Sequence, residues 1–244
     1  FRSIKTISIK EIEFLNESIN LNKKISEEGI NNNYGLEVGK TIFSSNQLEK
    51  IDVKSYITSM TSAASDARMG GCQLPVMTNC GSGNQGITTS LPVIYFGEYF
   101  NFSKENILRA IALSNLVAIH LKQKLGKLSA LCGVIISAIG ASCGMVFLKG
   151  GDINNINFAI KNMIGNITGM ICDGAKPSCA MKVSSGVSTA MLSALMAIEN
   201  KVVTSSEGII DDDVDKSIAN LTAIGSIGME ATDKLVLQIM TKKA

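Results

Sequence analysis

The residues of this chain best suited to chemistry are three cysteines in two short segments. Cys172 and Cys179 lie seven residues apart in MICDGAKPSCAMKVS, and Cys132 lies forty residues upstream in LSALCGVIIS. Thiolate sulfur is the ligand that iron–sulfur clusters use, and three ligands to a four-iron cluster leave one iron open as a Lewis acid. We interpret the three cysteines as ligands of such a cluster. The spacing alone fits buried structural cysteines as well, and it does not match the C-x-x-C pattern of a zinc ribbon.

A glycine-rich segment, TNCGSGNQG (78–86), is the second candidate for a functional role. Its glycines leave backbone N–H groups unobstructed, and side-chain donors come from Thr78, Asn79, Ser82 and Asn84. Such arrangements bind carboxylates or phosphates. The segment is not a P-loop, because no Lys-Ser/Thr pair follows the glycines. We expect it to hold a substrate next to the cysteines; a plain turn between helices is the alternative.

The same segment suggests a different cofactor. Its Ser82-Gly83-Asn84 stretch is similar to the loop with which some pyridoxal-phosphate enzymes hold an amino-acid carboxylate. That cofactor needs a Schiff-base lysine, for which Lys182 or Lys176 would be the candidates. The sequence shows no alternation of β and α patterns, which counts against this alternative.

The composition excludes some classes of partner. The 244 residues are 45% hydrophobic and 18% charged, and the net charge is +2, so there is no electrostatic case for binding nucleic acid or an anionic membrane surface. The opening FRSIKTISIKEIEF starts with Phe and lacks the features of a signal peptide. We therefore expect a cytoplasmic protein, and a chain that is a fragment of a longer one without its N-terminal half.

One apolar segment raises the possibility of a membrane protein. Residues Leu128 to Leu148 form a run of 21 residues without a charge, which is long enough to span a bilayer. The run contains three Gly, three Ser and two Cys rather than a continuous wall of Leu, Ile and Phe. We favour a central helix buried in a helical bundle, with a non-catalytic helical membrane protein as the alternative.

Periodicity and capping signals predict a mainly α fold in a single domain, residues 1–244. Residues 72–92, punctuated by Pro75 and Pro92, are expected to form a loop segment. An amphipathic helix is expected from Ile9 through Leu21, ended by the Asn-rich turn at 31–33. Further helices are expected over Gln47–Met69, Lys104–Leu125 with Ser103 as N-cap, Leu128–Leu148, from Asp152 to Met170, Ala180–Asn200, Val214–Ile227 after an acidic cluster, and Ala231–Met240.

Three motifs in the same order resemble a known family. They are ASDARMGGCQLPVMTNCGSGNQGITTSLPV, LSALCG and ICDGAKPSCAMKVS, and the likeness runs from about residue 40 to the end of the chain. The sequence resembles the UPF0597 / L-cysteine desulfidase proteins, which are related to the alpha chain of iron–sulfur L-serine dehydratases. The resemblance implies a helical catalytic domain of the serine dehydratase alpha-chain type. It also implies a [4Fe–4S] cluster held by Cys132, Cys172 and Cys179, and a substrate carboxylate bound around Asn79, Ser82, Gly83 and Asn84.

The activity that this resemblance implies is a β-elimination. L-Cysteine would give pyruvate, ammonia and sulfide, or L-serine would give pyruvate and ammonia, and the motifs do not separate the two substrates. Family members carry an upstream half with a Gly-Cys-Thr-Glu-Pro-like motif that this chain lacks, so the catalytic base stays unassigned and the activity of this polypeptide alone stays open. The missing half and a second copy of the chain are the protein partners that we consider.

Overall fold

The computed structural model describes residues 1–45, 51–126 and 129–242. Within these ranges the chain is helical, and the only β-type pairing is two isolated bridges. The mainly α prediction is therefore confirmed. The elements are α1 (Arg2–Thr6), α2 (Ile9–Ile12), α3 (Leu15–Asn31), α4 (Val38–Ser45), α5 (Val53–Met69), α6 (Gly83–Tyr99), α7 (Lys104–Leu125), α8 (Gly133–Leu148), α9 (Ile153–Ile167), α10 (Cys179–Ile198), α11 (Val214–Ala223), the π-helical turn η1 (Ile224–Gly228) and α12 (Glu230–Thr241).

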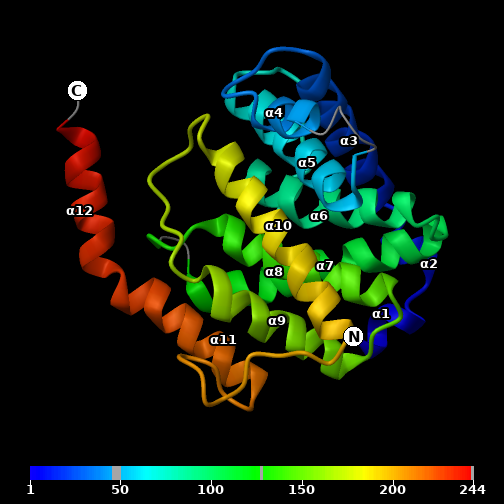
Figure 1. Cartoon of the computed structure of the whole chain (residues 1–244), viewed down its shortest axis with the longest axis vertical. Coiled ribbons are helices and arrows are strands. Elements are labelled where there is room, and N and C mark those ends of the chain that lie inside the picture. The colour runs from blue at the N-terminus through cyan, green and yellow to red at the C-terminus, as the bar shows by residue number, and fades with distance from the viewer. Residues whose placement is uncertain (46–50, 127–128, 243–244) are drawn as a thin grey trace.

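Helix α8 is the centre of the bundle. It packs against α6, α7, α9 and α10, and nearly all of its side chains are buried (Figure 1). Small residues let the neighbours come close: a Cβ on Gly140 would lie only 2.3 Å from the carbonyl oxygen of Ser114 in α7. The burial expected for this apolar run is confirmed over α8, which is 16 residues long. It begins at Gly133 rather than Leu128, since Leu131 pairs with Ile171 and Cys132 is the N-cap.

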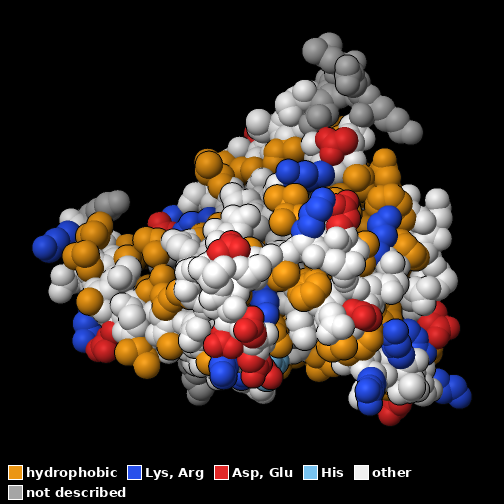
Figure 2. Space-filling view, turned by 60° about the horizontal axis from the view of Figure 1, so that its bottom comes forward, with side chains coloured by type: hydrophobic (Ala, Val, Ile, Leu, Met, Phe, Trp, Pro, Cys, Tyr) orange, Lys and Arg blue, Asp and Glu red, His pale blue; other side chains and the backbone are white. Residues whose placement is uncertain are grey.

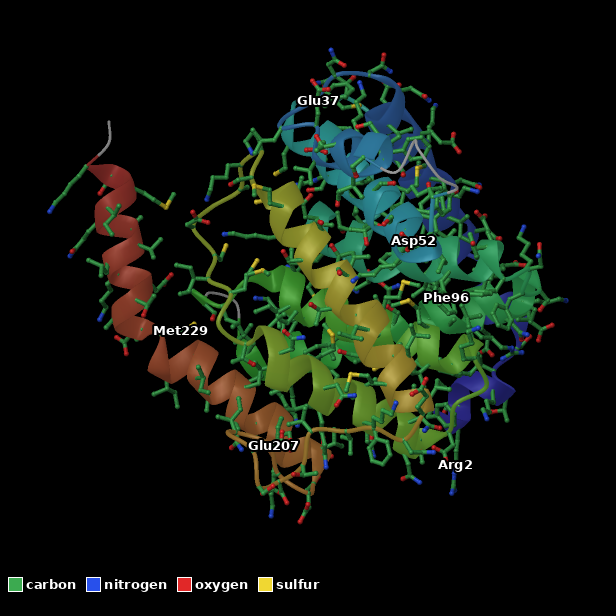
Figure 3. The ribbon with its side chains drawn as sticks, in the orientation of Figure 1. Arg2, Glu37, Asp52, Phe96, Glu207 and Met229 are labelled. Carbon is green, nitrogen blue, oxygen red and sulfur yellow. The ribbon has the colours of Figure 1, made fainter. Side chains whose placement is uncertain are left out.

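A second group of helices packs beside this centre. Helix α5 contacts α3, α4, α6 and α10, and α3, α4 and α5 form the upper part of the molecule in Figure 1. Asp52 starts α5 by accepting hydrogen bonds from the N–H groups of Lys54 and Ser55, and it is labelled at that position in Figure 3. The part of the predicted helix at 46–50 lies outside the described residues.

Several predicted helix starts are confirmed by capping hydrogen bonds within the first turn of the helix. Ser103, Asp152 and Asp213 each accept a hydrogen bond from a backbone N–H in the first turn of α7, α9 and α11, respectively. Helix α7 has the predicted bounds, and α10 and α12 differ from theirs by one or two residues. The predicted helix 214–227 is divided, because its last residues form the π-helical turn η1.

Two predictions for the first part of the chain are wrong. Residues 72–92 are a loop only as far as Ser82, since α6 starts at Gly83 and passes through Pro92. Every residue of α6 from Gly83 to Gly97 is buried, and this packing outweighs the helix-breaking tendency of proline. The predicted amphipathic helix at 9–21 is broken at Glu13 and Phe14 into α2 and α3.

The C-terminal arm, α12, leaves the bundle after η1 and carries exposed apolar side chains (Figures 1 and 2), whereas η1 still contacts the bundle through Gly225. No residue of α12 is buried, and Leu235, Leu237 and Ile239 are all exposed. Among the described helices, α10 alone is long and apolar enough to cross a membrane, and 44% of that apolar stretch is buried in the bundle.

Candidate active site

A short antiparallel pairing brings two of the three cysteines together. The N–H of Cys172 donates to the carbonyl of Ala130 at 2.6 Å, and the N–H of Cys132 donates to the carbonyl of Met170 at 3.0 Å. This pairing joins the segment before α8 to the segment after α9. Two cysteines that are forty residues apart in the sequence are therefore neighbours in the fold.

The two thiols interact directly, and the interaction separates their acidities. A hydrogen bond from Cys132 lowers the pKa of Cys172 to about 5, with further help from the backbone N–H of Gly174 and the charge of Lys182. The same hydrogen bond, together with burial, raises the pKa of Cys132 well above its ordinary value. The contact therefore favours the thiolate form of Cys172, which is the form that binds metal.

Cys179, the first residue of α10, completes a cavity of about 210 Å³ that all three cysteines line. Its thiol is turned toward the loop, where Sγ donates to the carbonyl of Gly174 at 3.6 Å. As the side chains of residues 1–45, 51–126 and 129–242 are oriented, no three of their His, Cys, Asp and Glu groups stand close enough to hold a metal ion. The cysteines thus share one cavity wall without yet converging on one point.

Asp173 fixes the loop between Cys172 and Cys179 through two lysines. Its carboxylate pairs with Lys176 Nζ at 2.5 Å and with Lys182 Nζ, which also donates to the carbonyl of Ile171 at 2.8 Å. These hydrogen bonds lower the pKa of Asp173 to about 2, which makes it a poor base near neutral pH. Both candidate Schiff-base lysines are therefore engaged in holding this loop.

The start of α6 also lines the cavity. Ser82 is the N-cap of α6 and accepts from the N–H of Gln85 at 3.5 Å, and Gly81 precedes it with a φ of +78°. Gly81, Ser82, Asn84 and Gln85 all line the cavity. The N-terminal end of a 17-residue helix, with its free N–H groups and positive dipole, therefore lies beside the cysteines.

The other predicted substrate residues lie differently. Thr78 and Asn79 line a separate cavity formed with α1, α2 and α7, and Asn79 donates from Nδ2 to the Asn115 side chain at 2.8 Å. Gly83 is buried at the start of α6, where a Cβ would lie 2.2 Å from Nε of Arg68. The structure thus brings Ser82 and Asn84 to the cysteines but not Thr78 or Asn79.

Arg68 and Gln85 are cavity residues that sequence reasoning did not select. Arg68, from the last turn of α5, donates from Nη1 to Oδ1 of Asn84 at 3.3 Å. The side chain of Gln85 lies against Gly133, the residue after Cys132. In the sequence, Arg68 stands just before Gly70-Gly71 and the glycine-rich segment, which is the signal that could have pointed to it. Only the packing of α5 on α6 shows that its side chain reaches the cavity.

The sequence profile described as "Serine dehydratase alpha chain" matches residues 2–238, which is nearly the whole chain. The chain belongs to the serine dehydratase alpha chain family. The match begins earlier than residue 40, where the recognisable motifs start.

Relatives named UPF0597 protein agree with this membership of the serine dehydratase alpha chain family. One from Parabacteroides distasonis is 61% identical over 97% of this chain and 55% of its own length. One from Porphyromonas gingivalis is 58% identical over 96% and 54%, and the UPF0597 protein YhaM of Escherichia coli is 46% identical over 99% and 56%. The chain spans about half the length of these relatives. No solved structure matches it.

The iron–sulfur cluster expected of a serine dehydratase alpha chain can be tested against the residues present. Three thiols line one cavity, the Cys132–Cys172 contact favours the thiolate form of Cys172, and Cys179 makes a sulfur-to-carbonyl hydrogen bond to Gly174. The donor set therefore fits a cluster with three cysteine ligands.

Proposed function

We propose that this chain carries the cluster-binding site of a β-eliminating lyase that deaminates L-cysteine or L-serine. The observation that carries the proposal is that Cys132, Cys172 and Cys179 line the same cavity as the N-terminal end of α6. One small cavity would thus hold both a metal centre and a helix N-terminus that binds anions. This combination suits a substrate that carries a leaving group and a carboxylate.

In this proposal the three cysteines hold a [4Fe–4S] cluster. When bound, the cluster supplies an open iron that acts as a Lewis acid toward the β-thiol or β-hydroxyl of the substrate. Cys132 and Cys179 sit at the starts of α8 and α10, and Cys172 sits in the bridged segment, so rigid backbone positions each ligand. The ion pairs of Asp173 with Lys176 and Lys182 keep the loop between two ligands in one shape.

The chain's own residues would bind and orient the amino acid. The carboxylate would lie at the N-terminal end of α6, where backbone N–H groups and the hydroxyl of Ser82 can donate to it. Loss of the α-proton to a base and departure of sulfide or water give aminoacrylate, which water hydrolyses to pyruvate and ammonia. The base is unassigned, and the half of the relatives' length that this chain does not span is where we look for it.

We propose that the protein is cytoplasmic, and its free thiols support this because a reducing compartment keeps cysteines unpaired. All six cysteines lie in the described part of the chain and are free. A homo-oligomer is compatible with the exposed apolar arm at α12, and it belongs to the same proposal.

The test is the iron and acid-labile sulfide content of the full gene product, purified without oxygen. About four of each per chain are expected for one cluster. Cys132→Ala, Cys172→Ala and Cys179→Ala should each abolish or strongly lower this content. Cys143→Ala, at a cysteine buried within α8, and Cys72→Ala, outside the cavity, are the matched controls and should retain it.

Turnover of L-cysteine and L-serine by the same preparations completes the test. Pyruvate formation should be lost in the three ligand variants and kept in the two controls. Unchanged iron and sulfide in the ligand variants would overturn the cluster assignment, and a loaded protein that consumes neither amino acid would overturn the reaction.

A further inference from the structure

We propose that Arg68 and Gln85 recognise the two charged groups of a free α-amino acid, the guanidinium of Arg68 binding the carboxylate and Oε1 of Gln85 accepting from the ammonium. The proposal rests on the function proposed above for the class of ligand. It assigns a specificity role to two side chains outside the cysteines and outside the predicted glycine-rich site residues.

Arg68 is placed to bind an anion within the cavity. It is half-buried, and among the described residues that line the cavity no other carries a fixed charge. No carboxylate in the described part of the chain forms an ion pair with it. Its contacts with Asn84 and with the Met69 sulfur both use Nη1, which leaves further donors of the planar guanidinium for a carboxylate.

The helix end beside Arg68 favours the same anion. Gly83 is within van der Waals range of the Arg68 side chain, since a Cβ at Gly83 would fall 2.2 Å from Nε. The guanidinium therefore lies against the first turn of α6, where the helix dipole is positive. A carboxylate placed there meets the guanidinium and the N–H groups of α6 together.

Gln85 offers the complementary group. Only 8% of the residue is exposed, and Oε1 is covered by the protein and accepts no hydrogen bond from any residue that the structure describes, so the side-chain amide must turn toward the cavity to meet a ligand donor. A buried amide oxygen without a donor costs about 1–3 kcal/mol, so a ligand that supplies a donor gains that much over one that does not. A substrate ammonium is such a donor, and a carboxylate is not.

The two side chains also lie at different places along the cavity. Arg68 contacts Gly83 and Asn84, whereas the Gln85 side chain lies within about 3 Å of the Cβ position of Gly133, next to Cys132. The carboxylate end of a ligand would thus lie toward α5, and its ammonium toward the start of α8 and the cysteines. This order places the β-substituent on the cysteine side of the cavity.

The experiment uses L-alanine as an amino acid without a leaving group, with ethylamine and propionate as the versions that lack one charged group. Binding to the cluster-loaded full gene product is measured by ligand-observed NMR, which detects weak affinities. We expect L-alanine to bind at least about tenfold more tightly than either truncated compound, as one charge-assisted hydrogen bond supplies that factor.

Arg68→Met should weaken L-alanine binding by roughly 10–100-fold and leave ethylamine binding unchanged, whereas Arg68→Lys, which keeps the charge without the fork, should fall between. Gln85→Met should weaken L-alanine roughly tenfold and leave propionate unchanged. The controls Arg2→Met and Gln123→Met, at exposed positions outside the cavity, should bind all three ligands as the unchanged protein does. Thermal unfolding shows whether each variant is folded. If Arg68→Met does not fold, Arg68→Lys tests the role of the guanidinium in its place.

The outcomes separate this inference from the proposed reaction. If both cavity variants bind L-alanine like the controls while cysteine or serine is still consumed, the roles of Arg68 and Gln85 are wrong and the reaction stands. If L-alanine binding depends on them but neither amino acid is consumed, the amino-acid site stands and the reaction is wrong. An unchanged protein that binds propionate as well as L-alanine, or that binds no L-alanine, overturns the inference.

Discussion

Asp66 is a buried carboxylate outside the cavity, and it supports the start of a helix. Its Oδ2 accepts from the N–H of Gly39 in the first turn of α4 at 2.9 Å. Burial raises the pKa of Asp66 to about 6, although hydrogen bonds from the N–H groups of Gly39, Leu36 and Val38 act in the opposite direction. The folded protein therefore holds a proton on Asp66 in a pH range where the unfolded chain has already lost it.

We predict that this carboxyl makes the protein less stable as the pH rises from 4 to 7. Because the folded pKa lies above the unfolded value of 3.8, the stabilising contribution of Asp66 is fully present below that unfolded value and is lost as the pH rises through about 6. The change is on the order of 3 kcal/mol. Urea unfolding of the natural protein and of Asp66→Asn at several pH values measures this change. The difference between their free energies of unfolding should shrink as the pH rises.

Asp52→Asn is the control for this pH dependence. Hydrogen bonds from Ser55 lower the pKa of Asp52, so its contribution changes only below pH 4. The difference between the natural protein and Asp52→Asn should be constant from pH 4.5 to 7.5. A difference for Asp66→Asn that is equally constant would contradict the raised pKa.

Sequence reasoning at the scale of single residues found chemical types but not their directions. Cys132, Cys172, Ser82 and Asn84 could be selected because cysteine and glycine-rich segments have few roles. Arg68 could not, because its role depends on the contact between α5 and α6, which periodicity does not reveal. Cys179 was selected from spacing, and the turn of its thiol toward Gly174 is a rotamer that no sequence pattern encodes.

At the scale of helices, close contacts between backbones explain several glycines. A Cβ at Gly140 in α8 would lie 2.3 Å from the carbonyl oxygen of Ser114 in α7, and that oxygen belongs to the backbone and cannot rotate away. Gly169, after α9, has no atom within 4 Å of its Cβ position. An added methyl group therefore meets the backbone of α7 at Gly140 but meets no neighbour at Gly169, which serves as the control.

We predict that Gly140→Ala destabilises the protein by roughly 1–3 kcal/mol, since α7 and α8 must move apart. Propensity alone predicts the opposite sign, because alanine in a helix is better than glycine by about 0.5–1 kcal/mol. Gly169→Ala should change the free energy of unfolding by less than about 0.5 kcal/mol. Guanidinium unfolding of the three proteins decides the question, and a stabilised Gly140→Ala would show that the two helices are not in such close contact.

The errors in helix prediction have the same origin in packing. Pro92 lies inside α6, although proline inside a helix costs about 3 kcal/mol, because the whole segment from Gly83 to Gly97 is buried between α5, α7 and α8. Ser114 Oγ ties α7 to the turn before Pro92 by donating to the carbonyl of Thr89 at 2.7 Å. Caps such as Asp152 were predictable because they act within one turn, whereas burial of α6 depends on residues far away in the sequence.

At the scale of the whole molecule, the bundle and the C-terminal arm have different contacts. Helix α11 is anchored by Leu221, which is fully buried, whereas α12 has no buried residue and its side chains project outward from the ribbon after Met229 (Figure 3). Its far end approaches the cysteine loop, since a Cβ on Gly174 would lie 3.0 Å from Cε of Met240. The helical class was predictable from periodicity, but an apolar helix with no buried residue was not.

We predict that ending the chain after Met229 changes the free energy of unfolding of the bundle by less than about 0.5 kcal/mol, because no residue of α12 is buried. Leu221→Ala is the positive control and should cost about 2–5 kcal/mol.

Sedimentation velocity should show less self-association for the shortened chain, and the same change for Leu235→Lys combined with Leu237→Lys, because both remove exposed apolar surface. A shortened chain as destabilised as Leu221→Ala would mean that α12 packs on the bundle. A shortened chain that is equally stable and less associated would make the arm a contact between copies of the protein, one that lies close enough to Gly174 for assembly to affect the cavity.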